Sequence, residues 1–287
     1  MSEKEGYELG SVVILWWILS LLSVLFIVFD WPHAPIDTTM HMAFLLVTIF
    51  MGPLGLVLYI LTVREPLPGT HRQYIAPLWK QAVGSTLHCV AGDSVGIIGA
   101  AVIIGLFHSQ HISMILNLFI EYVAGFLVGW LIFQSLFMKD MVGGSYLVAL
   151  RKMFLPEWLS MNGVMAGMIA VMVPWIRLHP AAASPHQGEF WFMMSLALIA
   201  GAILAYPLNW WMVAAHLKHG LMSTEPQTTS HEEHVSNHSQ QHQHLAHNHD
   251  ASMSHNMNGH QTQYRKIWYI TMWSVGILAA SLGAVFI

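Results

Sequence analysis

Nine histidines stand within one polar segment of the chain, at spacings that suit metal binding. Neutral imidazole is a good ligand for zinc, copper, nickel and cobalt, and histidine-rich tracts often bind such metals. The first four would share one face of a helix, and the pairs two residues apart would chelate a metal in an extended chain. We therefore expect this segment to bind a transition-metal ion, copper or zinc; the alternative is a pH-responsive or inert linker. The histidines are His231, His234, His238, His242, His244, His247, His249, His255 and His260.

A second group of polar side chains interrupts apolar sequence. His88, Cys89 and Asp93 fall within one and a half helical turns, and Asn117 and Glu121 are one turn apart in the next apolar stretch. A carboxylate inside a membrane is costly unless it is paired, so it is a functional candidate by default. His, Cys and Asp are also metal ligands. We predict that these five residues form a central transport site, in which the two carboxylates face each other and suit cation passage or a proton relay. The alternative is a structural aspartate hydrogen-bonded to a neighbouring helix.

Methionine provides a third pattern, because the chain has 19 methionines. Met161, Met165, Met168 and Met172 recur at helical spacing and form one stripe. Thioethers select Cu(I), although methionine also packs well in any apolar helix, so a soft-ligand role and simple packing both remain open. His41, at the outer end of its predicted span, is a candidate residue of the metal entrance.

Other catalytic signatures are weak. Gly92-Asp93-Ser94-Val95-Gly96 matches the G-x-S-x-G string of serine hydrolases, but it falls inside an apolar helix rather than at a strand-to-helix turn. The sequence holds no nucleotide-binding glycine motif and only one cysteine. We expect no enzyme, no nucleotide cofactor and no nucleic-acid partner.

The composition requires a lipid environment for these residues. The chain has 287 residues, 55% of them hydrophobic and only 9% charged, whereas soluble domains carry about a quarter charged residues. A membrane span needs about 20 mostly apolar residues. Seven stretches qualify and predict an all-α polytopic bundle: Ser11–Phe29, Met40–Val63, Ser85–Phe107, Ser113–Phe137, Trp158–Ile176, Phe190–Ala214 and Ile267–Ile287.

The basic residues predict the orientation of these spans. With the N-terminus in the cytosol, ten of the eleven Lys and Arg residues fall in inner loops and only Arg177 falls outside. This bias predicts a C-terminus outside, in a bacterial cytoplasmic membrane. It also predicts three parts: a six-span membrane domain over residues 1–223, a cytosolic disordered His-rich loop over 224–263, and a final transmembrane helix over 264–287. The short apolar stretch Gly143–Pro156 is interpreted as a loop or an interfacial helix.

Glycine pairs four residues apart indicate how the helices pack. Gly92/Gly96, Gly125/Gly129 and Gly163/Gly167 lie on the third, fourth and fifth predicted spans. Small residues let helices approach closely in lipid. We expect these three spans to form the tightly packed centre, and the same faces offer a route to a homo-oligomer.

Three motifs resemble an uncharacterised bacterial integral-membrane family that is catalogued as a domain of unknown function. They are His88-Cys89-x-x-Gly92, Phe137-Met138-Lys139-Asp140-Met141, and Asn209-Trp210-Trp211-Met212-Val213 followed by Lys218-His219-Gly220 and Met222. Members of the family are loosely labelled permeases or copper-related proteins. The resemblance covers about Met40 to Met222 and implies a membrane fold without an assigned activity. The chain departs from the family pattern at Asp93 and Ile97, where that pattern has a cysteine and an acid.

These observations favour transport or handling of a transition-metal cation, copper or zinc, with the cytosolic His-rich loop as a metal-binding arm. Two alternatives remain open: a membrane redox protein with haem or copper held by histidines, and a non-metal permease with an incidental His-rich loop.

Overall fold

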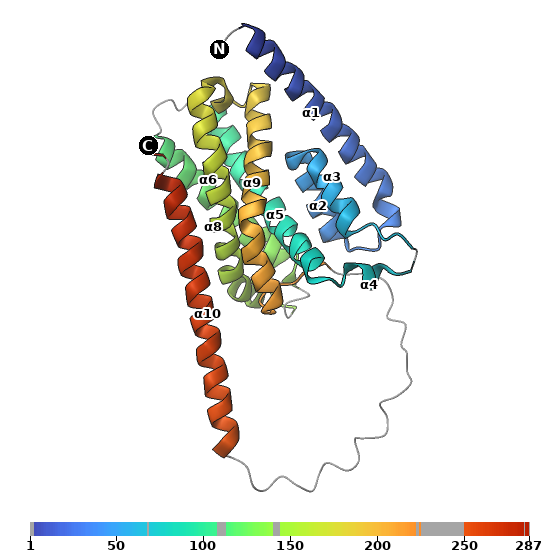
Figure 1. Ribbon diagram of the computed structural model, residues 1–287, viewed down its shortest axis with the longest axis vertical. Helices are drawn as coiled ribbons and strands as arrows, with labels where there is room; N and C mark the ends of the chain where they lie inside the picture. The colour runs from blue at the N-terminus through green and yellow to red at the C-terminus, as the bar shows by residue number, and fades with distance from the viewer. Residues whose placement is uncertain are drawn as a thin grey trace.

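The computed structural model describes residues 3–67, 69–107, 113–139, 144–221, 224, 250–283 and 285–286, with side chains from residue 10 onward and, in the last helix, from residue 265. Across these ranges the chain forms helices and no strand, which confirms the all-α class. Five helical stretches are long and apolar enough to cross a membrane: Gly10–His33, Leu78–Leu106, Met114–Leu136, Tyr146–Leu178 and Gly188–Ala214. The protein is therefore a membrane protein whose long helices run side by side (Figure 1).

The long helices carry the following labels in Figure 1. The first is α1 (Glu3–Asp30), which continues into the short 3₁₀ turn η1 (Trp31–His33). The central bundle comprises α5 (Leu78–Leu106), α6 (Met114–Val128), α8 (Tyr146–Leu178) and α9 (Gly188–Ala214). α6 runs directly into a π-helix, η2 (Gly129–Leu136), so that these two elements make one crossing. The last helix, α10 (Asp250–Gly283), packs along α8.

The predicted second span, Met40–Val63, is wrong, because this stretch folds as a hairpin of two short helices. α2 (Thr38–Met51) and α3 (Pro53–Thr62) are separated at Gly52, whose φ of 65° is a conformation that favours glycine. Pro53 cannot continue the hydrogen-bond ladder of α2, so it begins a new helix instead. Helices of 14 and 10 residues are about 21 and 15 Å long, too short for a hydrocarbon core of about 30 Å.

Contacts at the ends of this hairpin show that it returns to the side of the bundle from which it starts. Tyr59 in α3 donates a hydrogen bond of 2.8 Å to Asp30 at the end of α1, and Arg64 forms an ion pair of 3.0 Å with the same carboxylate. The backbone N–H of Thr224, beyond α9, bonds to the carbonyl of Pro35 at 2.9 Å. The end of α1, both ends of the hairpin and the end of α9 therefore share one end of the bundle, here called the hairpin end.

The opposite end of the bundle holds the start of α1 and the end of α10. Trp16 of α1 packs edge-on against Phe192 near the start of α9, with ring centroids 5.6 Å apart. The side chain of Arg177, at the end of α8, donates to the carbonyl of Val285 at 2.6 Å. The start of α1 and the end of α10 therefore lie at the same end of the bundle. The predicted orientation with termini on opposite sides does not fit this arrangement.

Glycines bring the bundle helices together in two pairs. A methyl group at Gly96 would collide with the backbone of Ala124 and Gly125 in α6, and one at Gly167 would collide with the backbone of Ala200 and Gly201 in α9. The glycine pairs of the third and fourth predicted spans thus join α5 to α6 and η2, as expected. The glycine pair of the fifth predicted span, Gly163 and Gly167, faces α9 instead. Because neighbouring helices of the same chain cover these faces, they are not free to form an oligomer.

Two predicted boundaries shift in the structure. The stretch Gly143–Pro156 belongs largely to α8, which begins at Tyr146 and includes Pro156. α10 begins at Asp250, so the segment predicted to be disordered up to Gln263 is helical in its last part. Residues 225–249 lie outside the described residues, and with them the first seven histidines of the His-rich segment.

Candidate functional site

A fully buried cysteine lies at the centre of the polar site. Cys89 of α5 is 0% exposed, and its thiol donates to Oε2 of Glu157 on α8 over 2.8 Å. The Gln134 amide donates to the same sulfur over 3.0 Å, and the Lys218 ammonium contacts it as well. Three polar partners thus reach Cys89 from η2, from α8 and from the segment after α9.

The ammonium of Lys218 is held by sulfur and oxygen atoms of the bundle. Its side chain is 3% exposed. Nζ donates to Oδ1 of Asn209 over 2.9 Å and lies 3.6 Å from Oε2 of Glu157, in addition to its contact with Cys89. The Asn209 amide group donates to Ser160 Oγ over 2.8 Å, which turns its oxygen toward the lysine. The site therefore holds a buried cationic side chain, the Lys218 ammonium, among sulfur and oxygen atoms.

The charge on Lys218 depends on these partners. Burial by itself lowers the pKa of an ammonium group. Cys89, Glu157 and Asp93 act in the opposite direction and leave the pKa of Lys218 above its usual value. These partners therefore favour the charged form of Lys218 in spite of its burial.

Asp93 and Glu157 form a pair of buried carboxyl groups. Both residues are 0% exposed, and a side chain at Gly129 of η2 would collide with Oδ1 of Asp93 and with Oε1 of Glu157. Both oxygens of Asp93 and Oε1 of Glu157 lack a hydrogen-bond donor. Carboxylates only accept hydrogen bonds, so these two groups can bond to each other only when a proton lies between them. The pair is therefore a place for a shared proton or a bound cation.

The π-helix η2 positions two parts of this site. Gly129 provides the space for the carboxyl pair, and Gln134 contacts both Cys89 and His88. Short π-helical turns widen a helix locally and are frequent at functional sites. A regular α-helix through this stretch would rotate Gln134 relative to Gly129, so the irregular geometry brings both residues to the same site.

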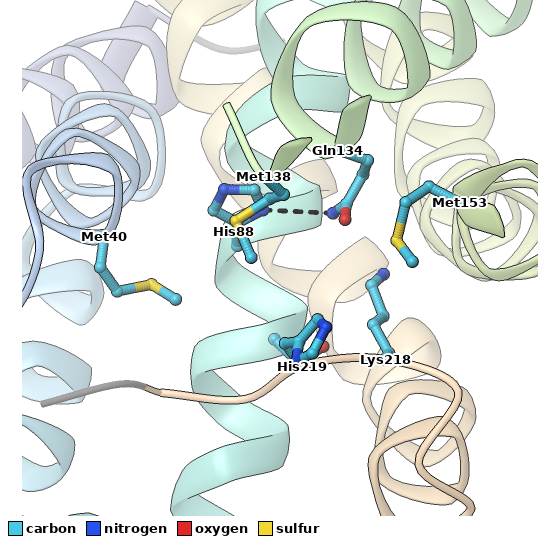
Figure 2. Close-up of a pocket in the computed structure, with 8 residues that line it drawn as sticks. Met40, His88, Gln134, Met138, Met153, Lys218 and His219 are labelled. Carbon is cyan, nitrogen blue, oxygen red and sulfur yellow. Dashed lines mark hydrogen bonds between the residues drawn. The ribbon is translucent and has the colours of Figure 1, made fainter. Parts of the chain in front are cut away.

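A small cavity adjoins the site at the hairpin end. It has a volume of about 10 Å³, which is room for one water-sized particle. His88 lies between this cavity and Cys89. Its Nδ1 is 3.2 Å from the Gln134 amide nitrogen, and its Nε2 is buried without a hydrogen-bond partner. The cavity is lined by Met40, Ser85, His88, Gln134, Met138, Met153, Lys218 and His219 (Figure 2).

Three of the five predicted central residues lie in this site, and two lie elsewhere. His88, Cys89 and Asp93 are buried in α5 next to Glu157 and Lys218. Gly96 faces Gly125 in the antiparallel contact of α5 with α6, so Glu121 lies roughly two turns closer to the opposite end than Asp93. Glu121 is buried, and its Oε2 has no partner; Asn117 lies one turn further from the site. The carboxylate next to Asp93 is Glu157 rather than Glu121.

The other predicted ligands lie apart from this centre. His41, the predicted entrance residue, lies at the hairpin end and is stacked on Trp31 with ring centroids 4.5 Å apart. The methionine stripe of α8 is fully buried in the helix bundle: Met161 lies against Gly125 and Met168 against Gly201. Its contacts are those of a packed core.

The described residues contain no conventional metal cluster. Within the described ranges, no three His, Cys, Asp or Glu side chains converge on one point as metal ligands. The first seven histidines of the His-rich segment lie outside these ranges. His255 and His260 fall on the helical backbone of α10, where the side chains are not described. Ser94 lies within α5, and its hydroxyl donates to the Ala91 carbonyl over 2.9 Å, so it does not occupy a nucleophile turn.

The site contains four residues that were not predicted to be functional: Gln134, Glu157, Asn209 and Lys218. Of these, Asn209 and Lys218 lie in the motif that carries the family resemblance. Glu157 lies four residues before Met161, on the same helical face as the methionine stripe, and a longer fifth span would have included it. Lys218 has the appearance of an ordinary inner-loop lysine. Its side chain turns into the bundle, which no local pattern indicates.

Comparison with known proteins agrees with the resemblance seen in the sequence. Residues 78–218 match the model of a domain of unknown function, DUF4396. No curated protein and no solved structure matches the chain. The matched segment begins with α5 and ends at Lys218, so it excludes α1, the hairpin and α10, and is shorter than the resemblance implied. The segment that holds Cys89, Asp93, Glu157 and Lys218 is therefore the part of the chain that is similar to DUF4396.

Proposed function

We propose that this chain transports or handles a transition-metal cation, copper or zinc, in a bacterial cytoplasmic membrane. The observation that carries the proposal is the buried ammonium of Lys218. It is held by Cys89, Asn209 and Glu157, which offer a thiol sulfur and two kinds of oxygen to a positive charge inside an apolar bundle. A site that stabilises a buried cation in this way also suits a metal cation of similar charge.

The chemistry of the donors supports a transition metal. Thiolate is a soft ligand that favours copper and zinc, and carboxylates add negative charge. Cys89 and Glu157 already touch, and Asp93 lies on the other side of Glu157. For Zn(II), release of the thiol proton and displacement of the Lys218 ammonium would remove the same positive charge that the metal adds. Cu(I) would require only one of these two losses.

The carboxyl pair provides a route for the released proton. Asp93 and Glu157 lie side by side without a donor, so they can hold one proton between them. Exchange of a metal ion for protons at this pair would couple metal movement to a proton gradient. Intramembrane carboxylates commonly serve as such relays.

The charge distribution supports a cytosolic location of the hairpin end. α10, with the five spanning helices, makes six crossings, so we place both the start of α1 and the end of α10 outside. Only Lys4 and Arg177 then lie outside, which fits the positive-inside rule. The His-rich segment follows Lys218 and would be cytosolic, where it can accept or supply metal. The basic residues at the hairpin end are Arg64, Arg72, Lys80, Lys139, Arg151, Lys152, Lys218, Arg265 and Lys266.

Transport by purified protein tests the proposal. The chain is reconstituted in liposomes that contain a fluorescent metal indicator, and uptake of Cu(I) and of Zn(II) is followed with and without a pH gradient. We expect uptake by the wild type and none above empty liposomes for Cys89→Ser and Glu157→Gln. Glu189→Gln, which removes a carboxylate at the start of α9, is the control and keeps the wild-type rate. Uptake of neither metal by the wild type, or equal rates in all variants, would refute the proposal.

A further inference from the structure

We propose that the cavity beside His88 is a binding site for a soft monovalent cation, Cu(I). This inference rests on the proposed function and specifies its metal. Figure 2 shows Met40 and Met153 on opposite sides of His88, and Met138 lines the same cavity. Three thioethers and two imidazoles thus line a cavity with room for one particle.

The chain collects these donors from five separate elements. Met40 comes from α2, His88 from α5, Met138 from the turn after η2, Met153 from α8 and His219 from the segment after α9. Methionines at helical spacing on one helix are explained by packing. Packing does not explain why methionines from three elements meet histidines at one cavity. Apolar packing alone gives no reason for the two imidazoles.

The buried nitrogen of His88 indicates a missing partner. Nε2 is inaccessible to solvent and has no hydrogen-bond partner, which is unfavourable for a polar atom in an apolar bundle. A metal at Nε2 would satisfy it. Metal binding at Nε2 would place the ring proton on Nδ1. The Gln134 amide would then turn its oxygen toward Nδ1 and give up its present hydrogen bond to Cys89. Such an outer partner fixes the orientation of a ligating imidazole.

The charge of the lining favours Cu(I) over divalent metals. None of the residues that line the cavity is acidic, and the Lys218 ammonium is among them. A divalent ion beside this ammonium meets twice the repulsion of a monovalent one. Neutral thioethers and imidazoles are soft ligands that suit Cu(I), whereas Mg²⁺ and Ca²⁺ require oxygen ligands.

The position of the cavity fits an intermediate metal-binding site next to Cys89. His88, Gln134 and Lys218 line the cavity, and Gln134 and Lys218 also contact Cys89. On the other side, His219 leads along the chain to the His-rich segment that begins at His231. A Cu(I) ion in the cavity therefore lies next to two of the residues that contact Cys89.

X-ray absorption at the copper edge tests this assignment on the full chain. Purified protein receives one equivalent of Cu(I) from a chelator that buffers the free ion, so that only the tightest site fills. We expect sulfur neighbours in the wild type. The double variant Met138→Leu, Met153→Leu keeps only Met40 of the three thioethers, so it should lose most of the sulfur scattering and bind Cu(I) roughly 10- to 100-fold more weakly. The matched control is Met165→Leu, Met168→Leu, which changes two core methionines of α8 and should retain both properties.

The outcomes separate this inference from the proposed function. Nitrogen-only coordination in the wild type, a result that needs no variant to fold, would overturn the cavity assignment. So would sulfur scattering that the cavity double variant leaves unchanged. Zinc transport that depends on Glu157, without Cu(I) in the cavity, would overturn the assignment and leave the proposed function standing. Absence of any metal binding or transport would overturn both.

Discussion

Replacement of Lys218 by methionine tests whether the buried ion pair forms as described. Methionine has nearly the length of lysine but no charge, so it keeps the packing and removes the cation. Glu157, which is 0% exposed, then loses its counter-charge, and Asn209 Oδ1 loses its donor. Removal of one partner of a buried ion pair costs about 3–5 kcal/mol, because the remaining charge stays buried without compensation.

A double-mutant cycle isolates this effect. Replacement of Glu157 by glutamine in the Lys218→Met background removes the uncompensated charge, so the double variant should be more stable than the sum of the single changes predicts. For contacting residues such coupling amounts to about 0.5–3 kcal/mol. Lys80→Met is the control. Its ammonium lies 2.8 Å from the centre of the Tyr74 ring, and loss of that contact should cost only about 0.5–2 kcal/mol.

The assay is the free energy of unfolding in mixed detergent micelles, measured by titration with a denaturing detergent. All four variants are compared with the wild type at neutral pH. The reasoning is refuted if Lys218→Met costs no more than Lys80→Met, or if the effects of Lys218→Met and Glu157→Gln simply add. Either result would mean that Lys218 does not lie buried against Glu157.

Three further predictions concern topology, packing and pH. Reporter fusions to the two termini should both report the outer side and a fusion in the His-rich segment the cytosol; an N-terminal reporter on the cytosolic side would contradict the α2–α3 hairpin. Gly167→Ala should lower the unfolding free energy by about 1–3 kcal/mol because its methyl group meets the backbone of α9. Gly99→Ala, with open space around it, should instead be neutral or stabilising by up to roughly 1 kcal/mol, the helix preference of alanine over glycine. The pKa of Lys218 is raised on folding. The contribution of charged Lys218 to the free energy of unfolding should therefore be constant up to the unfolded pKa of about 10.4, and it should be lost only as the pH passes the higher folded pKa. A Lys218→Met difference in unfolding free energy that shrinks between neutral pH and about pH 9 would contradict this.

The apolar stretches and the small residues were predictable from the sequence because both depend on local composition. Hydrophobic length identified the bundle helices, and the glycine pairs marked where they approach each other. Met40–Val63 misled because its apolar length equals that of a span. Gly52 and Pro53 are the local signal of the break, but both residues also occur inside membrane helices, so only the contact of Tyr59 with Asp30 shows that the chain turns back.

The site was predictable in part, for a different physical reason. An aspartate in an apolar helix is conspicuous, so Asp93 was identified together with His88 and Cys89. Its partner was not, because Glu157 follows Arg151, Lys152 and Pro156 and so resembles the end of a loop. Which helix faces which is a matter of tertiary packing, and the π-helix that presents Gln134 and Gly129 has no clear sequence signal. The sequence around Lys218 has the composition of a loop, whereas its side chain is buried in the bundle.

The most direct test of a metal site in the membrane domain is the metal content of purified protein. Copper and zinc are measured by elemental mass spectrometry in three chains: the full chain, a chain without residues 224–263, and that shortened chain with Asp93→Asn. A buried metal site predicts that copper or zinc remains after the His-rich segment is removed and disappears with Asp93→Asn. Metal that is lost entirely with the His-rich segment, or that Asp93→Asn leaves unchanged, would contradict a metal role for Cys89, Asp93 and Glu157.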